Sequence, residues 1–379
     1  MKALAAPQAV HRSAGETFDA IVIGGGLVGT AIALGLQSRG LDTVLLDEGD
    51  VAFRAARGNF GLVWVQSKGH TYRPYARLSR RAAGEWPDFA RDLAARTGID
   101  VGFEGAGGFY LCLSESEFAA RAGLMQRQFE ADLPVPDAYE MMDRSALRDY
   151  LPDVGEAVVG ACFCRLDGAA NPLALFHALH AAYRAAGGTL RNAAPARRVA
   201  AAAEGGTVDT DGERYAAPRI VLAAGLANVE LGAGIDLSMP VRPVRGQILV
   251  THKMPVRLRY PTHTIRQMPE GAIILGDSRE DVGRDDGTRP EVMSAIARRA
   301  IASFPFLEHV HLLRAWGGLR TMTPDGIPLY RQSSTHPGLF GVNVHSGVTL
   351  APIHVGPLAA AIAEGNVAEA FPDFAGLRT

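Results

Sequence analysis

The chain has 379 residues, enough for one very large domain or two of ordinary size. Hydrophobic residues make up 47% of it and charged residues 21%. These values are near the globular average and exclude a disordered, collagen-like or coiled-coil protein. Lysine and arginine number 38 against 40 acidic residues, so the net charge of −2 gives no indication of a nucleic-acid partner.

The sequence predicts neither a transmembrane segment nor a secretory leader. The longest apolar stretch, 339–363, is interrupted by polar residues and a proline. Residues 1–17 contain only a short alanine-rich run, which predicts a flexible N-terminal tail. Cys112, Cys162 and Cys164 are too few for a disulfide framework and lack further metal ligands nearby, so we expect them to be buried and expect no metal site. Together these features predict a cytoplasmic protein.

The predicted elements mix strands and helices without a clear linker. Continuous apolar runs that end in glycine, such as 18–23, are typical of buried parallel strands. In chain order we expect a strand at 18–23, a helix at 26–38, a strand at 41–47, a helix at 79–97, a strand at 107–114, helices at 115–131 and 171–186, strands at 219–224, 244–251, 272–276 and 338–344, and a helix at 347–363.

Gly24, Gly26 and Gly29 form the pattern G-x-G-x-x-G between the first predicted strand and the helix that follows. Gly24 permits a tight turn, Gly26 lets a pyrophosphate approach the backbone, and Gly29 lets the helix pack on the sheet. The helix start offers free N–H groups, and Asp47, 18 residues past Gly29, can accept the hydroxyl hydrogens of an adenosine ribose. The pattern predicts a dinucleotide site, with an ordinary glycine-rich turn as the alternative. It disfavours NADP but does not separate FAD from NAD.

The C-terminal part of the sequence favours FAD. The strand at 338–344, a turn at Gly347 and the following helix form a second helix start that favours anions. A nicotinamide cofactor has no need of this second element. A flavin does, because its reduction places negative charge on one edge of the ring, which a helix N-terminus stabilises.

Seven segments of the chain resemble one known family. In chain order they are IVIGGGLVGTAIALGL, LLDEG, DGAANPLAL, VLAAGLAN, VRPVRGQI, GGLRTMTPDGIP and HSGVTLAP. They resemble the D-amino-acid oxidase superfamily, most of all its branch of glycine oxidases, sarcosine oxidases and opine or D-hydroxyproline dehydrogenases. The resemblance extends over nearly the whole chain.

The resemblance implies a combined α/β and α+β fold, with a Rossmann-like FAD-binding domain and a substrate domain built on a large, mostly antiparallel sheet. Relatives that hold flavin covalently use a cysteine in the C-terminal third, whereas the last cysteine here is Cys164, so the implied FAD is noncovalent. On this sequence the FAD-binding domain would cover 18–85, 165–235 and 312–370, and the substrate domain 86–164 and 236–311.

Positions that match the family's FAD contacts are spread over the whole sequence. The first surround the pyrophosphate and ribose, the middle ones pass beneath the flavin ring, and the last meet its pyrimidine edge. They are Gly24, Gly26, Leu27, Val28, Gly29, Asp47, Glu48, Arg54, Ala55, Ala56, Asn59, Phe60, Gly61, Leu62, Ala196, Ala224, Gly225, Arg320, Asn343, Val344, His345, Ser346, Gly347, Val348 and Thr349.

Arg320 matches the arginine that binds the substrate carboxylate in this family, although it could instead pair with Asp325 and shape the turn. The rest of the implied substrate site departs from the family pattern. His345 stands where glycine oxidases carry a second arginine, and Thr264 stands where they carry a tyrosine. Arg266 could bind a second substrate carboxylate or form a salt bridge within the substrate domain.

The implied activity is FAD-dependent oxidation of the C–N bond of an amino acid, an N-substituted amino acid or an opine-like secondary amine. Hydride would pass to flavin N5, and the resulting imine would hydrolyse. Two alternatives stay open at this point: a noncatalytic or electron-relay FAD subunit of a heteromeric dehydrogenase, and an NAD-linked dehydrogenase. The expected partners are a small-molecule substrate and either a second copy of the chain or a partner dehydrogenase subunit.

Overall fold

The computed structural model describes residues 17–49, 55–129 and 138–377. The predicted tail at 1–17 lies outside these ranges except for Thr17, which forms an isolated β-bridge with Ala216. The strands are β1 (Ala20–Ile23), β2 (Thr43–Leu46), β3 (Leu62–Val63), β4 (Gly108–Cys112), β5 (Tyr139–Asp143), β6 (Gly160–Cys164), β7 (Gly168–Ala169), β8 (Thr189–Arg191), β9 (Arg198–Ala201), β10 (Gly206–Asp209), β11 (Arg214–Ala217), β12 (Arg219–Leu222), β13 (Arg242–Thr251), β14 (Ile265–Gln267), β15 (Ile273–Leu275), β16 (Leu312–Met322), β17 (Leu329–Gln332) and β18 (Leu339–Asn343).

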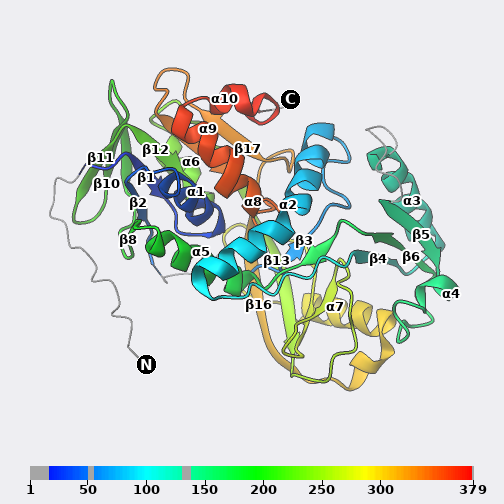
Figure 1. Ribbon diagram of the computed structural model, residues 1–379. Helices are drawn as coiled ribbons and strands as arrows, with labels where there is room; N and C mark the ends of the chain where they lie inside the picture. The colour runs from blue at the N-terminus through cyan, green and yellow to red at the C-terminus, as the bar shows by residue number, and fades with distance from the viewer. Residues whose placement is uncertain (1–16, 50–54, 130–137, 378–379) are drawn as a thin grey trace.

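Helices are interspersed with the strands along the chain (Figure 1). The α-helices are α1 (Leu27–Gln37), α2 (Arg73–Thr97), α3 (Glu115–Phe129), α4 (Arg144–Leu147), α5 (Pro172–Ala185), α6 (Asn228–Gly232), α7 (Pro290–Ser303), α8 (Ala351–Ile353), α9 (Ala359–Glu364) and α10 (Val367–Ala370). The other helical turns are η1 (Gly225–Ala227), η2 (Pro305–His309), η3 (His354–Leu358) and η4 (Pro372–Phe374).

A six-stranded sheet in the order β17-β18-β12-β1-β2-β8 forms one half of the molecule and combines strands from both ends of the described chain. All of its neighbouring strands are parallel except β17, which pairs antiparallel with β18. Every residue of β1 and β2 is buried because both sheet faces are covered. Val22 of β1 packs in the cluster of α1 and α5, whereas Ile21 packs in the cluster of the small sheet β11-β10-β9.

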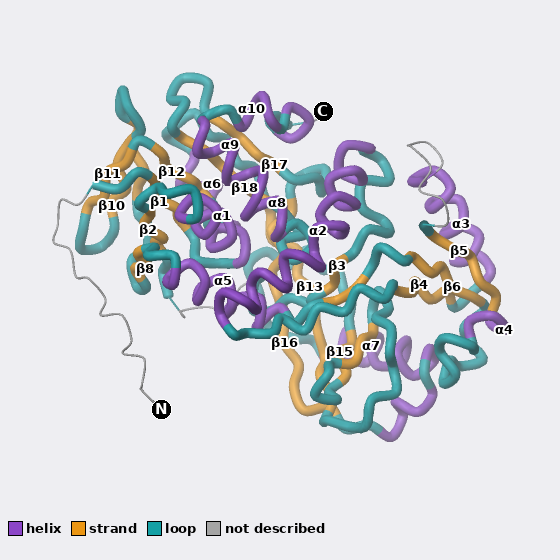
Figure 2. Tube along the Cα trace, viewed as in Figure 1, coloured by secondary structure: helices purple, strands orange, loops and turns teal. Residues whose placement is uncertain are grey.

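The other half is built on antiparallel strands. They lie below and to the right of the six-stranded sheet in Figure 2. One sheet has the order β14-β15-β13-β16 and another the order β4-β6-β5, and an isolated bridge between Phe109 and Thr262 connects them. The single large sheet that was expected is therefore divided in two. β16 pairs with β13 over its whole length, so the predicted boundary at 312 falls between two paired strands. The predicted boundary at 85 falls inside α2.

The last helical segment differs from the prediction of one helix at 347–363. Residues 347–350 form a turn, and the helix begins at α8, passes through the π-helical turn η3 and continues as α9. Pro357 lies in η3, where its missing N–H and its ring are incompatible with a regular α-helix. The Arg39 guanidinium donates hydrogen bonds to the carbonyls of Val355 and Gly356 in this turn, at 3.2 and 2.9 Å.

Gly35 allows α1 to cross this π-helical turn closely. A Cβ at residue 35 would overlap the carbonyl oxygen of Val355 and the methyl group of Ala359. We expect Gly35→Ala to lower the free energy of unfolding by about 1–3 kcal/mol, the usual cost of overpacking, despite the better helix propensity of alanine. Gly84→Ala in α2 is the matched control, because no atom lies within 4 Å of its added Cβ. Urea denaturation of both variants measures the difference, and equal stabilities would contradict the close crossing.

Candidate functional site

A cavity of about 1060 Å³ lies where the parallel sheet meets β13 and β16. It begins at the carboxyl ends of β1 and β2 and extends to the loop after β18. Ligands of open α/β sheets bind at this edge of the parallel strands. Predicted site residues that line it are Gly24, Gly26, Leu27, Val28, Asp47, Glu48, Ala55, Ala56, Asn59, Phe60, Leu62, Ala196, Ala224, Gly225, Arg320, Val344, His345, Ser346, Gly347, Val348 and Thr349.

The three glycines of the first motif have different local geometry. Gly24 has a φ of +107°, a backbone conformation that L side chains rarely adopt. A Cβ on Gly29 would overlap the carbonyl oxygen of Gly24, so this glycine permits the close packing of α1 on the sheet. A Cβ on Gly26 would enter the cavity, where only the Ala56 methyl lies within 4 Å, at 3.8 Å. No side chain caps α1, so its first N–H groups are free for a ligand.

Asp47 connects the glycine turn to the end of β2. Its Oδ2 accepts a hydrogen bond from the Gly25 N–H at 2.7 Å, and its Oδ1 accepts one from the Gly49 N–H at 2.9 Å. Asp47 and Glu48 both line the cavity at this end. The carboxylate therefore fixes the glycine turn at this end of the cavity.

Cationic side chains gather at the opposite end of the cavity. Arg320 of β16, Arg279 from the loop after β15 and Lys68 from the loop after β3 all line it. Arg320 forms an ion pair with Asp277, and its Nη1 donates to the carbonyl oxygen of Ser278 at 2.9 Å. The acidic partner of Arg320 is thus Asp277 and not Asp325, the partner expected if Arg320 only shaped the turn.

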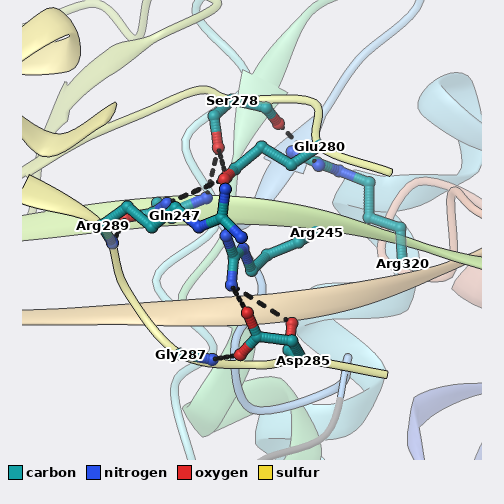
Figure 3. Close-up of polar contacts among 8 residues, drawn as sticks. All are labelled: Arg245, Gln247, Ser278, Glu280, Asp285, Gly287, Arg289 and Arg320. Atoms are coloured by element: carbon teal, nitrogen blue, oxygen red, sulfur yellow. Dashed lines mark hydrogen bonds and ion pairs between the residues drawn. The ribbon is translucent and has the colours of Figure 1, made fainter. Parts of the chain in front are cut away.

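A buried polar network holds the loop that carries Asp277 and Arg279 (Figure 3). The fully buried Arg245 guanidinium pairs with Glu280 Oε2 at 2.7 Å and with Asp285 Oδ2 at 2.6 Å. Residue 278 also enters this network, because its hydroxyl donates to Glu280 Oε1 at 2.8 Å. Since residues 278 and 280 are anchored to one side, residues 277 and 279 are left facing the cavity.

Lys68 and His345 meet inside the cavity, with 3.4 Å between Lys68 Nζ and His345 Nδ1. Desolvation, helped by the positive charges of Arg279 and Arg320, lowers the pKa of Lys68 to about 8. Burial and the same cations together with Lys68 hold the pKa of His345 well below its usual value. The imidazole is therefore neutral at physiological pH. Lys68 was missed by the sequence analysis because no motif marks it.

Tyr110 and His263 form a second wall of this end of the cavity. Their rings stack with centroids 3.7 Å apart and an interplanar angle of 12°. Burial and the nearby Arg299 and Arg121 lower the pKa of His263 to about 3, so this imidazole is also neutral. The residue predicted here was Thr264, one position along the chain.

Several predicted site residues lie away from the cavity wall. Thr264 is buried at the start of β14, and Arg266 is buried with its guanidinium 6.0 Å from the Phe60 ring, where burial lowers its pKa to about 10. Neither lines the cavity, so the predicted substrate contacts of both are not supported. Asn343 donates to the carbonyl oxygen of Thr321 at 3.4 Å. Gly29 and Gly61 serve close packing, and Arg54 lies outside the described residues.

The profile of the FAD dependent oxidoreductase family matches residues 19–362. The chain belongs to this family. Within this FAD dependent oxidoreductase family, an opine oxidase subunit of Agrobacterium tumefaciens (strain Ach5) is 39% identical over 361 residues, which cover 95% of this chain and 97% of that protein. The crystal structure of glycine oxidase from Geobacillus kaustophilus superimposes with a TM-score of 0.87 at 25% identity and covers 96% of this chain and 99% of its own.

Iminodiacetate oxidase from Chelativorans sp. BNC1 shares the fold, with a TM-score of 0.83, 19% identity and coverage of 94% and 98% of the two chains. These similarities confirm the predicted family, the fold and the FAD cofactor, and they exclude the NAD-linked alternative. The protein is an FAD-dependent amine or amino-acid oxidoreductase that oxidises C–N bonds. Its own geometry fits the cofactor, because the backbone at Gly26 leaves open the space that a pyrophosphate needs.

Among the helices of the described residues, none combines the length and the apolar character needed to cross a bilayer. Across 17–49, 55–129 and 138–377, no three His, Cys, Asp or Glu side chains gather into a potential metal site. Cys112, Cys162 and Cys164 are buried, and burial raises the thiol pKa of each. None of these three lines the cavity.

Proposed function

We propose that the protein oxidises a carboxylate-bearing amine, namely an amino acid, an N-substituted amino acid or an opine-like secondary amine. The observation that supports this substrate class is the cationic end of the cavity, where Arg320, Arg279 and Lys68 line the wall. The opine oxidase relative at 39% identity carries a substrate of this kind in its name.

We further propose that noncovalent FAD occupies the cavity with its pyrophosphate at Gly26 and the start of α1, its ribose at Asp47 and Glu48, and its flavin ring between Phe60 and the loop 344–349. When bound, FAD accepts the hydride from the substrate carbon. The FAD-binding part would comprise the six-stranded sheet with its helices, and β16 would belong to the substrate part with β13.

The residues of the chain would position the substrate rather than exchange protons with it. The Arg320 fork can hold a carboxylate by two parallel hydrogen bonds, which fixes the adjacent C–H toward the flavin. The neutral imidazoles of His345 and His263 leave the amine nitrogen free of positive neighbours on those two sides. With its lone pair free, the amine nitrogen forms the C=N bond as hydride leaves carbon. Water then hydrolyses the imine to a carbonyl compound and an amine.

Anaerobic reduction of the bound flavin tests the proposal. The holoenzyme is mixed with a panel of amino acids, N-substituted amino acids and secondary amines, with amines lacking a carboxylate as controls. Bleaching of the flavin absorbance is expected only with the carboxylated compounds. Flavin that no member of the panel reduces would favour an electron-relay subunit instead. Because the opine oxidase relative is named as one subunit of an enzyme, we also propose a partner chain, which a pull-down from the native host can test.

We expect Asp47→Ala to weaken FAD binding by about 1.5–3 kcal/mol, because a charged hydrogen-bond acceptor is lost at the ribose and the Gly25 turn is released. Titration of the apoprotein with FAD, followed by flavin fluorescence, measures the affinity. Asp19→Ala is the matched control, since the Asp19 carboxylate also accepts a backbone N–H, from Asp42 at 2.8 Å, but does not line the cavity. Equal FAD affinities of the two variants would remove Asp47 from the site.

A further inference from the structure

We infer that Lys68 is the specificity residue for a second anionic group of the substrate, a carboxylate carried on the nitrogen substituent. This inference rests on the proposed function and extends it from amines with one carboxylate to secondary amines with two. Arg266, the residue first considered for this role, is buried away from the cavity, whereas Lys68 lines it.

The loop that carries Lys68 is fixed by two buried side chains of α3. Ser67 has a φ of +69°, unusual for a residue other than glycine. Its N–H donates to Gln128 Oε1 at 3.0 Å, and its hydroxyl accepts from Arg121 Nη1 at 2.7 Å. The Gln128 amide also donates to the carbonyl oxygens of Val65 and Lys68, at 2.9 and 3.0 Å. The unusual backbone conformation of Ser67 is therefore held by four hydrogen bonds with the Arg121 and Gln128 side chains. This conformation directs Lys68 into the cavity.

The ammonium group of Lys68 lacks an acidic partner among the described residues. Its contact is with the neutral His345, and no carboxylate of the described ranges forms a salt bridge with it. A positive charge that is partly withdrawn from water is costly unless an anion compensates for it. An anionic group of the substrate would supply that compensation.

The groups around Lys68 carry an excess of positive charge. Arg279 and Arg320 add two positive charges, and Asp277, the cavity-lining carboxylate that acts on Lys68, is paired with Arg320. Asp167 lies behind the loop, where it accepts a hydrogen bond from the Val65 N–H and burial raises its pKa to about 7. The local charge is therefore positive by two units, or by one when Asp167 is ionised. While Asp167 is protonated, a single substrate carboxylate at Arg320 would leave the Lys68 charge unmatched.

Binding of two sulfur analogues separates this inference from catalysis. Thiodiacetate has two carboxylates and (methylthio)acetate has one, and neither can be oxidised as an amine. Each is titrated into the holoenzyme, and the perturbation of flavin absorbance gives its Kd. We expect Lys68→Met to weaken thiodiacetate by about 10- to 100-fold and (methylthio)acetate by less than about 3-fold. Lys253→Met is the matched control, because Lys253 is an exposed lysine outside the cavity.

The pH dependence of the wild type tests the same residue without relying on a variant that must fold. Affinity for thiodiacetate is expected to be constant just below pH 8 and to fall about tenfold per pH unit above it, because Lys68 then loses its proton in the free enzyme. The other charged groups that act on Lys68 are Arg279, Arg320, Asp277 and Asp167. Burial keeps the pKa of His345 well below this range, and Asp167, whose pKa burial raises to about 7, has lost its proton before Lys68 does. In Lys68→Arg the decline should disappear, since a guanidinium keeps its proton.

Anaerobic reduction by iminodiacetate and by N-methylglycine completes the test. If neither amine nor any other carboxylated amine of the panel reduces the wild-type flavin, the proposed substrate class fails, while the thioether titrations still decide the role of Lys68. If Lys68→Met weakens both thioethers equally, or neither of them, the second anion site is refuted. An equal slowing of reduction by both amines together with an altered flavin spectrum would place Lys68 against the flavin instead, which also overturns the inference.

Discussion

Gly26→Val is expected to yield a folded protein that carries no FAD. The backbone at residue 26, with a φ of −72° and a ψ of −175°, is extended and open to any residue, so the substitution introduces no backbone strain. The added side chain would instead fill the space where the pyrophosphate approaches the start of α1. The ratio of absorbance near the flavin bands to protein absorbance, measured beside circular dichroism, separates cofactor loss from unfolding.

Gly29→Ala is the informative comparison for this variant. Its Cβ would overlap the Gly24 carbonyl oxygen within the protein itself, so we expect a lower Tm even in the apoprotein. Gly26→Val should keep the Tm of the wild-type apoprotein. A Gly26→Val protein isolated with a full complement of FAD would rule out pyrophosphate binding at this turn.

Arg320→Lys is expected to lower kcat/KM for carboxylated amines by about 2–4 kcal/mol, or roughly 30- to 1000-fold, with FAD still bound. Lysine keeps the positive charge but loses the two parallel N–H donors that orient a carboxylate. Because the residue lines the cavity from β16, its replacement leaves the sheet intact. Steady-state kinetics per bound flavin give the ratio.

Asp277→Asn distinguishes the substrate role of Arg320 from a structural one. It removes the ion pair but leaves the guanidinium in place. If Arg320 serves only to hold the loop through Asp277, both variants should lose activity to a similar extent. If Arg320 binds substrate, Asp277→Asn should retain kcat/KM within about 3-fold, an effect of the size seen for exposed ion pairs. Wild-type kinetics in Arg320→Lys would remove Arg320 from the site.

The glycine motif, the strands and the chain order of the cofactor segments were predictable because each depends on local sequence. Continuous apolar runs predicted β1, β2 and β12, and the structure places them side by side. Helix ends were less predictable. α2 begins at Arg73, six residues before the predicted start at 79, since a proline in the first turn favours the helix there.

The substrate end of the cavity was less predictable because its residues are brought together by tertiary contacts. Lys68 depends on a clamp by Arg121 and Gln128 from a helix that does not itself line the cavity. His263 faces the cavity while its neighbour Thr264 is buried, and a tight turn decides this, since the Thr262 hydroxyl accepts the N–H of residue 265 at 2.8 Å. The sequence of a single chain does not predict which of two neighbouring residues faces a cavity.

The strand order of the parallel sheet has a consequence for the order of events during synthesis. β1, near the N-terminus, lies beside β12, and β12 lies beside β18, close to the end of the described chain. At about 5–20 residues per second, roughly 15 to 60 s pass on the ribosome between the emergence of β1 and that of β18. The cavity wall at 344–349 follows β18, so the cavity is completed only after both strands have been synthesised. Until then, the apolar edge of β12 that β18 will cover stays exposed, and nascent chains stalled before residue 339 are the form of this protein most exposed to aggregation.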